Sequence, residues 1–258
     1  MPRNVVHPWN HVQDFHAAFD FITETRGLDG KIDLDQVFLM GTSFAGGHVL
    51  VVGTERQQTH KPLPAGIIAQ VPHLSGKAAS IRSMRSRGVV GVLRFLGAAL
   101  SDYARTFSGL SPTYVNLSGQ EGELAVMQLS ATEYKQYWSK IPPSQEERLG
   151  FWDNRVAARI GLLVGRYSPI DRVGEVPEWS IPVMVSIAQR DSLCPPELVD
   201  ALTSRLPDAQ VVSGDWSHFD VYETEVKRYL TDLYTKFIQK HSKRTNRKAS
   251  QPHDPLPI

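Results

Sequence analysis

Residues 37–48 read Val37-Phe-Leu-Met-Gly-Thr-Ser-Phe-Ala-Gly-Gly-His48, and this stretch decides the fold. It contains a short apolar run, a turn of small residues and the start of a helix. A serine on such a strand–turn–helix unit has the layout of a nucleophile elbow, in which a strained turn exposes the hydroxyl. Gly41 and Ala45, two positions on either side of Ser43, let the turn pass close to its neighbours. We therefore predict that Ser43 is a nucleophile, with an acid and a base farther along the chain.

Strands and helices alternate around this unit. Apolar residues spaced three and four apart predict an amphipathic helix over residues 9–25, and a second helix is expected to follow the turn over about 44–54. Buried strands are predicted at 37–40, 65–71, 181–188 and 209–213, and later helices at 195–205 and 220–240. Continuous apolar runs are typical of parallel strands that are covered on both faces. The sequence thus predicts an α/β fold with a mostly parallel sheet.

The segment between the second and third predicted strands has a different pattern. Residues 73–179 show helical periodicities separated by turns and no clear strand. We predict that they form a helical cap, inserted into a single domain that spans residues 1–240. The tail at 241–258 is basic and then rich in proline, a composition typical of disorder.

Composition excludes several classes of protein. The 28 basic and 27 acidic side chains nearly cancel, so no overall field favours nucleic acid or an anionic membrane. The single cysteine, Cys194, excludes an internal disulfide and favours a reducing compartment. The sequence shows no signal peptide and no run of the ~18 apolar residues that a membrane-spanning helix needs. We therefore expect a cytoplasmic protein without a nucleic-acid partner.

Two downstream residues fit the acid and the base. In elbow enzymes the order along the chain is Ser, then Asp or Glu, then His, with the acid after a late strand and the histidine after the last one. Asp191 follows the third predicted strand and His218 follows the fourth. A serine hydroxyl needs a base to take its proton, and the base needs an orienting acid. We predict a Ser43–His218–Asp191 triad, with Asp215 and Asp220 as rival acids.

These residues resemble the α/β-hydrolase superfamily. Four motifs are similar to a branch with dienelactone-hydrolase-like and acetyl-esterase-like proteins and the fungal polyketide transferases and thiohydrolases of secondary metabolism. The motifs are Pro8-Trp9 with its helix, Gly41–Val49, Gln70-Val-Pro72 and His218–Tyr222. The resemblance covers about residues 1–80 and 165–240 and implies an α/β-hydrolase fold.

The resemblance also implies a chemistry. Ser43 would attack an acyl carbonyl, His218 would shuttle the proton and Asp191 would orient His218, without a metal or organic cofactor. The implied substrate is a small-molecule ester or thioester, free or on an acyl carrier, with a polyketide-type acyl chain favoured. Hydrolysis and acyl transfer use the same residues, so both remain open.

One part of the family's pattern is not recognisable. The superfamily has about four strands before the elbow strand, whereas only residues 1–36 precede it here. One oxyanion donor is the amide after the nucleophile, here that of Phe44, but the loop that carries the second donor follows an early strand. We therefore expect a sheet without its N-terminal strands. An alternative function follows, that of an impaired remnant that binds a small molecule or a partner.

Because no strands are recognised before residue 37, the sequence also predicts an edge strand. Residues 37–40 are expected either to be covered by the N-terminal helix or to form an open edge. An open apolar edge invites pairing with another chain, so a homo-oligomer is a possible consequence.

Several other side chains admit two interpretations. His73 follows a strand end, where ligands meet α/β sheets, and is a candidate for substrate binding. The cap aromatics, Trp138 and Trp152 among them, either line an acyl pocket or form the cap's own core. Arginines at 82, 85, 87 and 94 either meet a phosphate of a phosphopantetheine or coenzyme A thioester or form a solvated helix face.

The remaining histidines and the cysteine favour structural roles. His48, on the helix after Ser43, is predicted to pack rather than to react. His7, His11 and His16 lack a carboxylate cluster nearby, so no metal site is predicted. Cys194 shows no histidine pairing in the sequence and is interpreted as structural.

Overall fold

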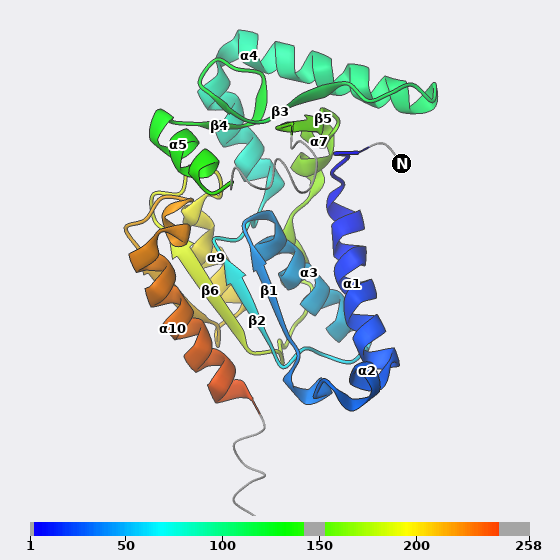
Figure 1. Cartoon of the computed structure of the whole chain (residues 1–258), viewed down its shortest axis with the longest axis vertical. Helices are drawn as coiled ribbons and strands as arrows, with labels where there is room; N and C mark the ends of the chain where they lie inside the picture. Colours follow the sequence, from blue (N-terminus) through cyan, green and yellow to red (C-terminus); the bar gives the residue numbers. More distant parts are fainter. Residues whose placement is uncertain (1–2, 142–152, 243–258) are drawn as a thin grey trace, which may run out of the picture.

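The structure, a computed structural model, describes residues 3–141 and 153–242, and its centre is a parallel sheet (Figure 1). The four strands lie in the order β1-β2-β6-β7, and every neighbouring pair is parallel. Their bounds are β1 Phe38–Thr42, β2 Gly66–Gln70, β6 Val183–Ala188 and β7 Gln210–Gly214. The α/β fold with a parallel sheet is therefore confirmed, with each strand within two residues of its predicted start.

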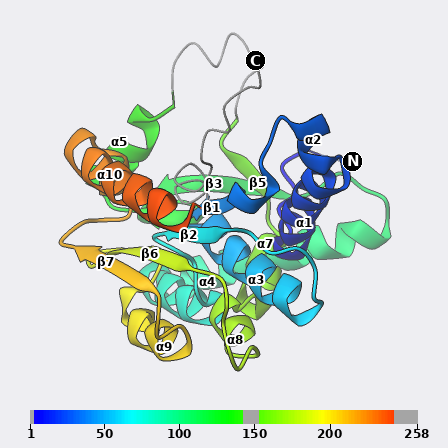
Figure 2. The same ribbon diagram turned by 90° about the horizontal axis from the view of Figure 1, so that it is seen from below.

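Helices cover both faces of this sheet (Figure 2). On one face, α3 (Phe44–Gln58) packs against β1 and β2 and is flanked by α1 (Pro8–Glu24) and α8 (Pro169–Val173). The helix α9 (Val199–Arg205) contributes Leu202 to the same core, and Leu206 follows directly after the helix. On the other face, α10 (Thr224–His241) contributes Leu230, Tyr234 and Phe237 to a second core.

The elbow helix α3 is buried on nearly every side. Val49, Leu50, Val51 and Val52 are all completely shielded from solvent. A helix that is apolar all round belongs between two layers, and here α3 lies between the sheet and α1. This packing anchors the helix whose first turn follows Ser43.

The cap, residues 73–179, lies at the carboxyl ends of the strands (Figure 1). Its described helices are α4 (Gly76–Phe107), α5 (Ala131–Ser139), α7 (Ile160–Leu163) and the helix α8 named above. It also contains a sheet of order β4-β3-β5, with β3 Tyr114–Gln120, β4 Ala125–Leu129 and β5 Arg155–Ala157. The expectation of no strand in this segment was wrong, because these strands are too mixed in polarity to show a continuous apolar run or a clear apolar alternation.

Short elements complete the chain. The five-residue helix α2 spans Arg26–Gly30. Single 3-10 turns lie at Leu34–Gln36, Val164–Arg166, Pro196–Leu198 and Asp220–Tyr222. None of the described helices has an apolar stretch that is long enough to cross a membrane.

Two apolar surfaces remain open among the described residues. β1 is an edge strand and Met40 on it is 49% exposed, while α1 packs on α3 rather than along this edge. The helix α4 bends at Gly88, whose φ of 64° suits glycine. Beyond the bend, exposed apolar side chains follow one another three or four residues apart: Val89, Leu93, Leu96, Leu100, Tyr103 and Phe107.

Candidate active site

Ser43 occupies a strained turn between β1 and α3. Its φ of 56° and ψ of −118° are unusual for a residue with a side chain, and such backbone strain costs about 1–3 kcal/mol. Two backbone hydrogen bonds hold the turn: the amide of Ser43 donates to Gln70 O (2.8 Å), and the amide of His73 donates to Ser43 O (2.9 Å). The strand β2 and its following loop therefore fix the conformation that exposes the Ser43 hydroxyl.

Small residues make this turn sterically possible. A Cβ atom on Gly41 would lie 2.1 Å from Ala45 O, and one on Gly47 would lie 2.3 Å from His73 O. Neither distance is compatible with a side chain, so the glycines let the elbow close on itself and on the loop after β2.

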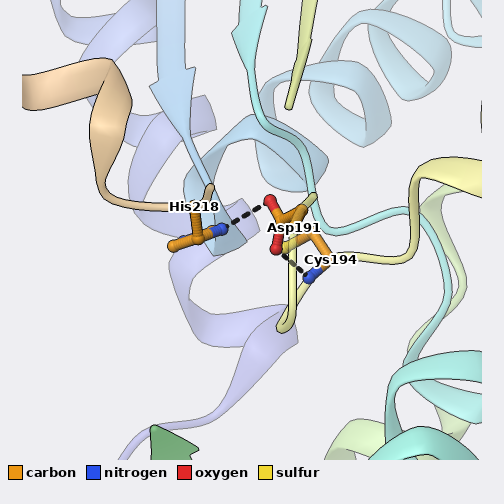
Figure 3. Close-up of side chains that lie close together, drawn as sticks. All are labelled: Asp191, Cys194 and His218. Atoms are coloured by element: carbon orange, nitrogen blue, oxygen red, sulfur yellow. Dashed lines mark hydrogen bonds and ion pairs between the residues drawn. The ribbon is translucent and has the colours of Figure 1, made fainter. Parts of the chain in front are cut away.

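Asp191 and His218 meet at the carboxyl ends of β6 and β7 (Figure 3). His218 Nδ1 donates a hydrogen bond of 2.6 Å to Asp191 Oδ2. The other carboxylate oxygen, Oδ1, accepts the amides of Leu193 (2.8 Å) and Cys194 (2.7 Å). Both side chains are buried, so the carboxylate is held in one orientation and in turn orients the imidazole.

The surroundings of His218 favour its protonated form. Burial alone would lower its pKa, but the interactions with Asp191 and Cys194 outweigh burial and raise the pKa above the usual value. A buried imidazolium is thus stabilised next to Asp191. That is the charge state that a general base reaches after it takes a proton.

Cys194 lies between the nucleophile and this pair. Its Sγ atom is 3.9 Å from Ser43 Oγ, and the potential ligand atoms of Asp191, Cys194 and His218 all lie within 4.8 Å of one another. The interpretation of Cys194 as lacking a histidine neighbour was wrong. The sequence offered one signal for this position, namely that Cys194 is only three residues from Asp191. A tight turn between the two residues brings the chain back to the site.

The serine and the histidine are not hydrogen-bonded to each other in the described chain, where the Ser43 hydroxyl faces Cys194. Catalytic hydrogen bonds in ligand-free proteins are often long and tighten only in the substrate complex. Ser43 therefore lies next to Cys194, which itself lies beside the Asp191–His218 pair.

The rival acids have other partners. Asp215 is exposed and pairs with Arg190. Asp220 accepts the amide of Ser217 and a hydrogen bond from Gln136 of α5, which links the cap to the histidine loop. Among the described residues, Asp191 is the acid that bonds to His218.

A cavity of about 740 Å³ opens between this cluster and the cap. Ser43, Phe44, His73 and Cys194 line one end, and apolar cap residues line much of the rest. Phe44 is the first residue of α3, so its amide has no partner within the helix and suits the oxyanion role that the sequence predicts.

His73 is a neutral imidazole beside the nucleophile. Burial, and then repulsion from His218, lower its pKa to about 4, although Asp191 acts in the opposite direction. Its buried Nε2 atom has no hydrogen-bond partner among the described residues. The structure thus places His73 in the cavity wall, as an uncharged polar group near neutral pH.

The two predicted cap tryptophans have different outcomes. Trp138 is half-buried on α5, packs against Tyr134 and Tyr137, and is not among the described residues that line the cavity. Trp152 lies outside the described residues. The position of Trp138 therefore does not support a role in the wall of the acyl pocket. It agrees with the alternative interpretation, in which Trp138 packs within the cap itself.

The other histidines take part in packing. His48 is buried, its Nδ1 atom lies 2.6 Å from the Tyr167 hydroxyl, and burial lowers its pKa to about 3. His16 Nε2 lies 2.9 Å from Glu55. The group of potential metal ligands found in the described ranges is Asp191, Cys194 and His218, whose carboxylate oxygens and Nδ1 atom already form the hydrogen bonds described above.

Comparison with known proteins supports this fold. No family model matches the chain. The quorum-quenching protein AidA of Acinetobacter baumannii (strain MDR-ZJ06) is 28% identical over 224 residues, which are 87% of this chain and 66% of AidA. This chain therefore spans about two thirds of that relative's length.

Two solved structures are similar in three dimensions. DcsB in complex with its substrate analogue has a TM-score of 0.68 at 15% identity and covers 93% of this chain and 74% of its own. The α/β hydrolase GrgF from Penicillium sp. sh18 has a TM-score of 0.61 at 18% identity, with the same two coverages. With its parallel sheet, its strained serine turn and these neighbours, the chain has the α/β-hydrolase fold.

Proposed function

We propose that this chain is a serine-dependent acyl hydrolase or acyltransferase that acts on an ester or thioester. The observation that carries the proposal is the strained turn at Ser43, which lines the cavity next to Cys194. The thiol of Cys194 in turn lies within 4.8 Å of the buried Asp191–His218 pair. A strained nucleophile turn and a buried acid–base pair serve acyl transfer better than simple binding, which needs neither.

The residues suggest the order of events. Ser43 Oγ attacks the acyl carbonyl while His218 Nε2 takes its proton, and Asp191 stabilises the resulting imidazolium. The Phe44 amide donates to the developing oxyanion at the start of α3, where the helix dipole also favours negative charge. His218 then protonates the leaving alcohol or thiol. Water or an acceptor alcohol, deprotonated by His218, attacks the acyl-enzyme, and His218 returns that proton to Ser43 Oγ as the acyl group leaves.

The cavity supports an apolar acyl group. Its apolar lining includes Phe95, Leu96, Leu117, Leu129 and Ile160 of the cap. A polyketide-type chain, which the sequence motifs favour, suits such a wall. The relationship to quorum-quenching protein AidA adds a second candidate, a bacterial signal molecule that carries an acyl carbonyl. His73 is proposed to contact the substrate near its reacting carbonyl.

A fluorophosphonate probe tests the chemistry, because it labels only activated serines. We expect labelling of the wild-type chain and none of Ser43→Ala. The matched control is Ser192→Ala, which changes a serine of the same cavity that bonds to Glu133 rather than to the triad. A folded wild-type chain that stays unlabelled would favour the alternative, a module that binds small molecules without turning them over.

A further inference from the structure

The helix α4 presents to the cavity two cationic side chains that the acyl chemistry does not use. Arg82 and Arg87 both lie on α4 and both line the cavity. The other two arginines of the segment, Arg85 and Arg94, are exposed and do not line it. The solvated helix face that the sequence suggested therefore applies to Arg85 and Arg94 only.

Arg87 is held by neutral groups. Its Nε donates to Ser83 Oγ (3.0 Å), its Nη2 donates to Val126 O (2.7 Å), and its guanidinium lies 4.5 Å from the Phe95 ring centre. Its Nη1 is buried and has no hydrogen-bond partner among the described residues. A guanidinium in this setting is oriented but leaves one donor unsatisfied.

No acid of the described chain neutralises this charge. The cavity wall includes Glu121 and Glu133, but neither forms an ion pair with Arg87, and Glu133 is bonded to Ser130 and Ser192. Burial lowers the pKa of Arg87 to about 10, with no opposing effect from a neighbouring carboxylate. An uncompensated, partly buried cation is costly unless something anionic joins it.

Arg82 carries a second guanidinium that lines the cavity. Its Nη1 also lacks a hydrogen-bond partner in the described ranges and lies 3.7 Å from the exposed Glu197 carboxylate, a weak surface pair. Both guanidinium groups thus retain donor capacity on the same wall. Planar guanidinium groups suit carboxylate and phosphate oxygens, which accept two parallel hydrogen bonds.

The position of Arg87 along α4 determines how far such an oxyanion would lie from Ser43. His73 contacts Ser43, and α4 begins three residues later at Gly76. Arg87 lies roughly 16 Å farther along the helix axis, at a rise of 1.5 Å per residue. The cavity wall as a whole is mainly apolar. The cavity therefore combines the reactive group Ser43, a largely apolar wall and a guanidinium at Arg87, well along α4 from the end that contacts Ser43.

We propose that Arg87 binds an oxyanion of the substrate that is remote from the scissile carbonyl. The substrate is then a long apolar ester or thioester with a carboxylate at the far end of its acyl chain or a phosphate on its carrier arm. The inference rests on the proposed function for the position of the reacting carbonyl. The shared chemistry of both sources is a charge-assisted, bidentate hydrogen bond to Arg87.

Matched substrates distinguish the two sources. One pair is the mono-para-nitrophenyl ester of sebacic acid and para-nitrophenyl decanoate, which differ in the terminal carboxylate. The other is S-decanoyl phosphopantetheine and S-decanoyl pantetheine, which differ in the phosphate. We expect Arg87→Met to lower kcat/KM for the charged member of one pair by about tenfold to a hundredfold, mainly through KM. The neutral member should change little, and Arg87→Lys should lie between.

Controls separate binding from folding and from catalysis. Arg85→Met, two residues away and outside the cavity, should leave both pairs unchanged. If no substrate is turned over, calorimetric binding of monomethyl sebacate and of phosphopantetheine to Ser43→Ala and to Ser43→Ala/Arg87→Met gives the answer without chemistry. An equal loss on charged and neutral substrates, or equal binding by the two Ser43→Ala proteins, overturns the proposal and leaves Arg87 a purely structural link between α4 and β4.

Discussion

His218 Nδ1 lies 2.6 Å from Asp191 Oδ2, and both side chains are shielded from solvent. Asp191 is held in turn by two backbone amides through its other oxygen. This relationship fixes the tautomer of His218, because the proton on Nδ1 points at the carboxylate and leaves Nε2 free to accept one from the nucleophile.

Removing the charge of Asp191 should therefore disable the base with little change of shape. We predict that Asp191→Asn lowers kcat by about 10⁴, as expected when an orienting acid is lost from a triad. The measurement is para-nitrophenyl ester hydrolysis, with circular dichroism to verify folding. Asp215→Asn is the control, because Asp215 is exposed and bonded elsewhere. If Asp215→Asn lost kcat to this extent and Asp191→Asn kept its activity, Asp215 rather than Asp191 would be the orienting acid.

The pH dependence of acylation should follow His218. The general base must be neutral, and its pKa is raised by Asp191 and Cys194, so kcat/KM should increase with pH until His218 is deprotonated. Cys194→Ala removes one of the two interactions that raise this pKa. We therefore expect the acidic limb of the pH profile to move to lower pH in this variant.

A pH–rate profile of the wild type and of Cys194→Ala checks this prediction. Cys194→Ser is a conservative control that keeps a hydrogen-bonding group without a readily ionised thiol. An acidic limb at the same pH in all three proteins would show that the thiol does not influence His218.

His73 should act as an uncharged hydrogen-bonding group. Its pKa of about 4 keeps it neutral across the range in which His218 titrates. We predict that His73→Phe, which fills the space but removes the ring nitrogens, lowers kcat/KM about tenfold, a typical value for one lost hydrogen bond to substrate. His73→Gln should recover part of the loss. Unchanged kinetics in His73→Phe would assign His73 to packing alone.

A buried ion pair should stabilise the cap. Asp102 on α4 is completely buried and accepts four hydrogen bonds, two from the Arg159 side chain and two from the amides of Thr113 and Arg159. We predict that Asp102→Ala lowers the free energy of unfolding by about 3–5 kcal/mol, because a buried cation and two amides lose their partner. Urea denaturation measures this, and Asp208→Ala, outside the cap, is the control.

The Asp102–Arg159 ion pair should also make the free energy of unfolding depend on pH. Burial would raise the pKa of Asp102, but the hydrogen bonds from Arg159 and Thr113 outweigh burial and lower it below the usual 3.8. Its contribution is therefore fully present above pH 3.8 and is lost as the pH falls through the lowered folded-state pKa. Asp102→Asn should flatten this part of the stability profile, and an unchanged profile would refute the assignment.

Self-association should involve the open edge of the sheet. Met40 on β1 is 49% exposed on an edge strand, and we predict concentration-dependent oligomers that Met40→Lys reduces, since a charged edge opposes strand pairing. Light scattering after size exclusion measures this. Leu93→Glu alters the other open apolar surface, on α4. Dissociation by Leu93→Glu alone would place the contact on the cap helix instead.

Much of the central fold was predictable because its signals are local. The run Val37–Met40 is followed by Gly41 and the helix after Ser43, and a buried parallel strand of this kind is apolar throughout. The cap was harder, because β3, β4 and β5 are only partly buried and mix polar with apolar residues, so the sequence pattern left them unrecognised. Cys194 was misinterpreted because its distance to His218 depends on how two separate loops return to the sheet.

The amino-acid sequence by itself determined the elbow at Ser43 and the order of acid and base, since both depend on residue type and on position after a strand. Only the tertiary structure decided which acid meets His218, because Asp191, Asp215 and Asp220 have similar local chemistry and differ in what packs around them. It also decided that Arg87 lines the cavity whereas Arg85 faces solvent. Both arginines lie on α4, and their environments differ because one side of this helix faces the cavity and another faces solvent.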